Sequence, residues 1–276
     1  MNAINRFAAV AALLFTVGIV GAEKAQAATV TSKGTDNYGQ SSFTGQQLSG
    51  TTPGWSNGTK KTSAGNDYVI DGHSLRTPCE TEGNKNFTFV GNSLTLKNSG
   101  GFQLKTYHTF TATFNNLIVA EGNGGKISNQ SNIGDGPKKV GSILTVTGSP
   151  WTLNSGSTLS FENNGTDTGH ANRYVSVDAT LVGSGAFACI NATTSTQPVT
   201  SRLNGNLSNF HGKLSASGSS SWSFRFGPNL TSIGALDGGF AADGVSFAAT
   251  PKVFFDGTLD FGATRGVTID NNITLT

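Results

Sequence analysis

The sequence is dominated by short runs in which apolar and polar residues alternate, separated by clusters of Gly, Asn, Ser and Asp. Alternation with a period of two places every second side chain on the same face of a β-strand. The polar member is usually Thr or Ser, which suits a strand face open to water. Helical spacing is missing after the N-terminal segment, so we expect an all-β protein. The runs include Phe87–Phe89, Leu94–Leu96, Phe102–Leu104, Leu144–Val146, Val175–Val177, Val267–Ile269 and Ile273–Leu275.

These runs also repeat along the chain. Residues 68–75 (YVIDGHSL) align with residues 87–94 (FTFVGNSL), and looser copies begin at Trp151 and Val253. The unit is a strand, a glycine turn and a second strand, with a period of about 20 to 25 residues, which is too short for a propeller blade of about 40 residues. Because so small a unit cannot bury its own apolar face, units must stack to form one core. We therefore predict a right-handed parallel β-helix, a β-solenoid with Leu75 and Leu94 facing inward. A β-sandwich is the alternative, since many short strands with glycine turns also describe one.

The composition argues against a disordered chain. Only 12% of the residues are charged and 37 of 276 are Gly, but the chain also has 18 Phe and 36% hydrophobic residues. Disordered chains have few aromatic residues and a high net charge, whereas the net charge here is +2. Nucleic-acid-binding proteins concentrate basic residues. This sequence has 18 Lys and Arg against 16 Asp and Glu, so we expect no nucleic-acid partner.

The N-terminal segment, 1–27, has the three parts of a secretory signal peptide. Arg6 gives the positive charge, the stretch 7–20 is apolar and uncharged, and Ala25-Gln26-Ala27 is a small-x-small cleavage site. The apolar run is shorter than the roughly 20 residues that span a bilayer. We therefore expect cleavage after Ala27, and a secreted or cell-surface protein that is associated with the outer membrane.

We divide the rest of the chain into a polar N-terminal cap or leader, residues 28–64, and a solenoid repeat region, residues 65–276. The chain ends inside an alternating run, which suggests a product truncated at the C-terminus.

At about 22 residues and 4.8 Å per rung, Cys79 and Cys189 would lie on the order of 24 Å apart. A disulfide requires Cα atoms within about 7 Å, so we expect two unpaired, mostly buried thiols.

One segment has a family resemblance. The pattern Leu203-x-Gly205-x-x-x-x-Phe210-x-Gly212-x-Leu214 resembles the autotransporter-associated β-strand repeat of autotransporter passenger domains. Residues 181–187 (LVGSGAF) are similar to the Gly-x-Gly segment that precedes this repeat, and residues 89–102 resemble large bacterial surface proteins built from it. The resemblance covers residues 65–276.

The resemblance implies a parallel β-helix that is displayed on, or released from, a Gram-negative cell. It also implies a partner, the outer-membrane transporter barrel. Such a barrel is made of segments of about 10 alternating residues, and too few residues follow Leu214 to form one. We therefore expect the barrel in the full-length gene or on a separate chain.

The residues that catalysis would require are scattered. A β-helix that cleaves polysaccharides needs clustered carboxylates with basic partners. Asp67 and Asp71, and likewise Asp256 and Asp260, lie four apart beside turn glycines, where Asp commonly stabilises a turn. Residues 165–169 (GTDTG) lack the apolar strands and the second Asp of an aspartic protease. We expect no catalytic residue, no cofactor and no bound metal.

The histidines share no metal-binding spacing, and we interpret each as a surface residue: His73, His108, His170 and His211.

The expected function is that of an exported structural or adhesin-like surface protein, and not that of an enzyme. The alternatives are a glycan-binding module and a carbohydrate-active β-helix enzyme. Exposed aromatic rings can stack on sugars; we expect Trp151 and Trp222 in the core, so Trp55 is the candidate glycan contact. The expected partner is an extracellular glycan or a host or cell-surface matrix.

Overall fold

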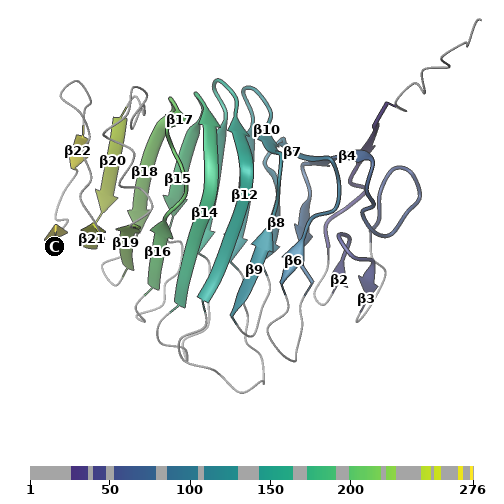
Figure 1. Ribbon diagram of the computed structural model, residues 1–276, viewed down its shortest axis with the longest axis horizontal. Helices are drawn as coiled ribbons and strands as arrows, with labels where there is room; N and C mark the ends of the chain where they lie inside the picture. The colour runs from purple at the N-terminus through teal and green to yellow at the C-terminus, as the bar shows by residue number, and fades with distance from the viewer. Residues whose placement is uncertain are drawn as a thin grey trace, which may run out of the picture.

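The computed structural model describes residues 26–36, 40–47, 53–78, 86–104, 109–129, 143–163, 173–190, 199–218, 222–227, 244–249, 252–255, 267–269 and 274–275. Within them the protein is all-β, and its strands pair in parallel except for β2 (Gln40–Ser41) with β3 (Gln46–Gln47) and two isolated bridges. The strands lie side by side along the long axis, from the purple N-terminal end to the yellow C-terminal end (Figure 1). This arrangement confirms the predicted parallel β-solenoid and is not a β-sandwich.

Three rows of strands form the wall of the solenoid. The third row is an eight-stranded sheet, and the first and second rows belong to a 13-stranded sheet in which β12 (Ile143–Leu153) and β14 (Arg173–Gly183) contribute to both. The first row also contains β6 (Phe87–Thr88), β9 (Phe110–Thr113), β16 (Val199–Leu203), β19 (Trp222–Phe226), β21 (Lys252–Phe255) and β23 (Thr274–Leu275). The second row also contains β1 (Ala28–Thr31), β4 (Asn66–Asp71), β7 (Ser93–Lys97), β10 (Leu117–Val119) and β17 (Asn209–Phe210). The third row is β5 (Ser74–Arg76), β8 (Gly100–Leu104), β11 (Gly124–Asn129), β13 (Thr158–Asn163), β15 (Ala186–Ile190), β18 (Lys213–Gly218), β20 (Gly244–Ala249) and β22 (Val267–Ile269).

The core is a stack of inward side chains that pair in register from rung to rung. The alternation predicts such columns, because each strand turns every second residue toward the interior. Leu75 and Leu94 are both fully buried, as predicted, although they lie in different rows. The second-row column is Val30, Tyr68, Leu94, Leu117, Trp151 and Leu181. The third-row column is Leu75, Phe102, Ile127, Phe161, Cys189 and Ala216.

The rungs are longer and less regular than the predicted period. Tyr68 pairs with Leu94, whereas Phe87, which the sequence alignment placed on Tyr68, pairs with Ala112 in another row. In the third row Asn129 pairs with Asn163, which lies 34 positions further along the chain. The predicted period was wrong because segments that connect the rows vary in length without changing the register of the wall.

The glycines of the autotransporter-like pattern lie where successive rungs approach most closely. A Cβ added to Gly205 would lie 1.7 Å from the carbonyl oxygen of Ala179, and one added to Gly212 would lie 1.5 Å from that of Gly185. Both contacts are with the backbone of the preceding rung, which a side-chain rotation cannot relieve. The pattern therefore extends over a single rung, from the first row to the third: Leu203 ends β16, Phe210 lies in β17 and Leu214 lies in β18.

Cys189 is a free thiol that is fully buried in the third-row column. Burial raises the pKa of this thiol well above its usual range, so it stays protonated and unreactive at physiological pH. The structure agrees here with the predicted unpaired thiol. Cys79 lies outside the described residues.

The segment before β4 packs over the N-terminal end of the core. Phe43 and Trp55 are buried, and the Trp55 ring lies 4.6 Å from that of Tyr68, centroid to centroid. Phe43 contacts the rings of several core residues, including Phe102 and Phe114. β1 meanwhile adds a strand to the second row by pairing with β4. Apolar side chains at this end of the solenoid are therefore removed from water.

Asp36 fixes this segment to the third row. Its carboxylate is buried and accepts hydrogen bonds from the backbone N–H of Arg76 (2.8 Å), the backbone N–H of Ser42 (3.0 Å) and the Ser42 hydroxyl (2.9 Å). Burial raises the pKa of Asp36 above its ordinary value of 3.8, against the opposing effect of these hydrogen bonds. The folded protein thus holds the Asp36 proton more tightly than the unfolded chain does.

We expect the Asp36→Asn variant to lose one component of the pH dependence of stability. A raised folded-state pKa contributes stability that is full below pH 3.8 and is lost as the pH rises through that raised pKa. The free energy of unfolding of Asp36→Asn, minus that of the wild type, should therefore be larger at pH 7 than at pH 4. Urea unfolding at both pH values measures this. Asp36→Ala is the control, because it should destabilise at both pH values by leaving buried donors without an acceptor. An unchanged difference between the two pH values would contradict the expectation.

Candidate functional site

Trp55, the predicted glycan contact, is fully buried. Its indole N–H donates a hydrogen bond to the Ser42 carbonyl at 2.8 Å, and its ring packs on Tyr68. The prediction was wrong for a physical reason: the indole completes the aromatic core and offers no exposed face to a sugar ring. Trp151 is buried as predicted, with its N–H donated to the Phe114 carbonyl at 2.7 Å. The side chain of Trp222 lies outside the described part of the structure.

The predicted turn carboxylates form hydrogen bonds between neighbouring rungs. Asp67 accepts a hydrogen bond from the Ser93 hydroxyl at 2.7 Å, and Asp71 accepts one from the Asn98 amide at 2.6 Å. Lys97 lies 3.7 Å from the Asp71 carboxylate. These contacts give both carboxylates a role in joining β4 to the next rung. Asp256 and Asp260 lie outside the described residues.

His73 is not the isolated surface residue that the sequence predicted. It is half-buried, and its Nδ1 lies 2.8 Å from the Ser32 hydroxyl, which also accepts the backbone N–H of Asp71 at 3.3 Å. Ser32 is itself buried, so this pair joins the segment after β1 to the following rung. No sequence signal could have revealed it, because the two residues are 41 positions apart. His211 is exposed as predicted. His108, His170 and residues 165–169 are not among the described residues.

Polar side chains form a continuous band on the outer side of the first row. Thr145 pairs in register with Thr111 and Ser176, and Arg202 pairs with Ser176 and Arg225. Thr147 likewise pairs with Thr113 and Asp178. Neighbouring strands are about 4.8 Å apart, so members of the band on adjacent rungs lie about one strand spacing apart along the solenoid axis. We call it the polar band: Thr111, Thr113, Thr145, Thr147, Ser176, Asp178, Arg202, Asn204 and Arg225. Ser176 and Asn204 are buried within the band.

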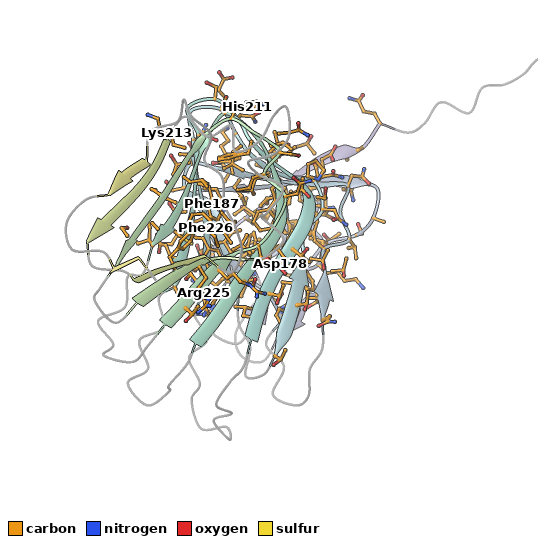
Figure 2. The ribbon with its side chains drawn as sticks, turned by 60° about the vertical axis from the view of Figure 1, so that its left-hand side comes forward. Asp178, Phe187, His211, Lys213, Arg225 and Phe226 are labelled. Carbon is orange, nitrogen blue, oxygen red and sulfur yellow. The ribbon has the colours of Figure 1, made fainter. Side chains whose placement is uncertain are left out.

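A hydrogen-bonded network fixes the charged end of the polar band. The Ser176 hydroxyl donates to the Asp178 carboxylate and accepts from Nε of Arg202 at 3.0 Å. Asn204 donates to the other Asp178 oxygen at 3.4 Å. Asp178 and Arg225 lie over the same sheet, whereas Phe187 and Phe226 lie inside the solenoid (Figure 2). The strands that carry these polar groups on their outer face therefore pack their inner face in the apolar core, which fixes the positions of the strands.

The chemistry available to the polar band is recognition by hydrogen bonds and charge. Glycoside hydrolysis requires two carboxylates, and Asp178 is the single carboxylate in the band. Over the described residues, no group of three or more His, Cys, Asp and Glu could hold a metal ion. The sequence showed the alternating Thr residues of this band, but their alignment with Asp178 and the two arginines depends on irregular rung lengths that it did not reveal.

The chain matches no family model, no curated protein and no solved structure. Across the described ranges, no helix is long and apolar enough to cross a membrane.

Proposed function

We propose that the protein is an exported structural or adhesin-like surface protein of the passenger type, without a catalytic site. The observation that supports this most is the register of the wall. It stacks apolar columns inside and aligns polar residues such as Thr111 with Thr145 and Thr113 with Thr147 outside, so the molecule offers an extended surface. Solenoid proteins use such extended surfaces for binding and assembly. The position of Gly205 and Gly212 at close contacts between rungs also supports the autotransporter-like resemblance.

Glycan binding is the second candidate function, now through the polar band and not through Trp55. Hydroxyl, amide and guanidinium groups at regular spacing can bond to the hydroxyls of a sugar chain. An enzyme that acts on carbohydrate is the less favoured alternative, because the band holds one carboxylate.

Export is tested with the N-terminus of the mature chain. Expressed in a Gram-negative cell, the full chain should leave the cytoplasm and begin at Ala28, because peptidases cleave after small-x-small sites. Cell fractionation followed by N-terminal sequencing measures both properties. As a control, Ala25→Leu with Ala27→Leu should retain the leader, since both small positions are lost. A cytoplasmic chain that still carries the segment 1–27 would contradict the proposal.

A further inference from the structure

We infer that Asn57 is an acceptor of N-linked sugar, and that Asn206 is a second acceptor on a later rung. Both residues begin an Asn-x-Ser/Thr sequon, the sequence that N-glycosylating enzymes recognise: residues 57–59 (NGT) and 206–208 (NLS). The inference goes beyond the proposed function, because it concerns a covalent modification of this chain and the class of enzyme that makes it.

The sequence alone does not select these two sites. The chain is rich in Asn, Ser and Thr, so sequons arise by composition, and six others occur in it. Two of the six, at Asn86 and Asn129, lie among the described residues. The other four lie outside them: Asn164, Asn191, Asn229 and Asn272. The structure therefore has to distinguish amides that can carry a sugar from amides that cannot.

The first argument is the exposure of the acceptor side chain. An N-linked sugar is bulky and hydrophilic, so it must project into water. Asn57 lies in the turn after Trp55, where residues 56–60 are all exposed, and Asn206 is exposed in the segment between β16 and β17. Asn129, by contrast, is 3% exposed, and its Nδ2 donates to the Asn163 side chain at 3.0 Å. A sugar on Asn129 would break this buried hydrogen bond.

The second argument is the conformation of the two sequons. In each, the Asn Oδ1 accepts the backbone N–H of the Ser or Thr two positions later, at 3.1 Å from Thr59 and 2.9 Å from Ser208. This is the turn that Asn side chains commonly form with their own backbone. It occupies the amide oxygen, and Nδ2, the atom that takes the sugar, makes no hydrogen bond to the described residues.

Two further contacts rank the exposed sequons. The Thr59 hydroxyl lies 2.8 Å from the same Asn57 oxygen and shares its proton with the Lys61 carbonyl at 2.9 Å. Asn86 is also exposed, but its oxygen accepts the backbone N–H of Thr111 at 3.2 Å and none from its own sequon. Asn57 is therefore the best-formed acceptor among the described residues.

The third argument is the chemistry of the transfer. The co-substrate is a sugar that carries a diphosphate on its anomeric carbon, and a separate glycosyltransferase binds it. Nδ2 of Asn57 forms a bond to that carbon and loses one proton, while the bond from the carbon to the diphosphate oxygen breaks with its electron pair. Negative charge grows on the amide as the proton leaves, and hydrogen bonds to the amide oxygen favour the charged form. The turn at Asn57 therefore assists the reaction at the atom that it leaves open.

The position of Asn57 gives the sugar a structural consequence. β1 is the terminal strand of the 13-stranded sheet. Ser56, the neighbour of Asn57, donates its N–H to the Thr31 carbonyl of β1 at 2.8 Å, and its hydroxyl accepts the Thr31 N–H at 2.9 Å. An uncovered terminal strand is a template for pairing with another chain. A sugar on Asn57 would hinder such pairing at this end of the solenoid.

The test is glycopeptide mass spectrometry of the full chain, purified from the cells that carry its gene, with fragmentation that keeps the sugar on its side chain. We expect sugar on Asn57, a lower occupancy on Asn206 and none on Asn129. Thr59→Ala should abolish the sugar on Asn57, although the acceptor amide is still present. Thr59→Ser should retain it, because this variant keeps both the sequon and the hydroxyl.

Asn92 is the matched control within the same protein. It is exposed like Asn57 but begins no sequon, so it should carry no sugar in any variant. Thermal unfolding checks that the Thr59 variants are folded. The inference would be overturned by an unmodified Asn57 in the natural protein, by equal modification of Asn92, or by unchanged sugar on Asn57 in Thr59→Ala. An unmodified Asn206 would overturn the second acceptor alone.

Discussion

Replacing Gly212 by Ala should lower the free energy of unfolding by about 3 kcal/mol or more, which is the range for overpacking and backbone strain. The added Cβ would lie 1.5 Å from the carbonyl oxygen of Gly185 and 2.8 Å from the Phe210 ring. The ring can move, but the carbonyl belongs to the backbone of the preceding rung. Relief therefore requires the rungs to separate where β15 and β18 pair. Urea unfolding followed by circular dichroism measures the change.

Gly124→Ala provides the matched control in the same third row. Its added Cβ would meet only the Ser99 side-chain oxygen at 3.4 Å and the Ser99 Cα at 3.9 Å. Ordinary contact of this kind should change the free energy of unfolding by less than about 0.5 kcal/mol. If Gly212→Ala were as stable as Gly124→Ala, the register that places Gly212 over Gly185 would be incorrect.

Replacing Trp55 by Ala should cost about 4 kcal/mol, the usual range for removal of a large buried aromatic side chain. The indole is fully buried against Tyr68, and its N–H donates to the Ser42 carbonyl. The variant leaves a cavity over the end of the core and a buried carbonyl without its donor. Thermal and urea unfolding measure the loss.

Trp55→Phe separates packing from hydrogen bonding at the same position. It keeps most of the ring contacts and loses the indole N–H, so its cost should be about 1 to 2 kcal/mol. Both variants should bind glycans as the wild type does wherever they remain folded, because Trp55 has no exposed surface. A folded Trp55→Phe variant that had lost glycan binding would instead support Trp55 as a glycan contact.

The sequence determined the fold class of this protein because alternation is a local property. Runs such as Leu94–Leu96 and Val175–Val177 assign each side chain to the interior or the exterior without reference to the rest of the chain. The buried columns confirm this for Leu75 and Leu94. Stacking follows from the same pattern, since a single rung cannot bury its own apolar face.

The tertiary structure alone decided which residues meet between rungs. The connecting segments differ in length, so the apparent sequence repeat aligned Tyr68 with Phe87, although Tyr68 pairs with Leu94. Nothing in the sequence indicated that Trp55 completes an aromatic cluster instead of facing water. For the same reason the sequence could not place Arg202 beside Arg225. Inside-or-outside orientation is fixed by neighbours along the strand, whereas contacts between rungs depend on the length of every segment that separates them.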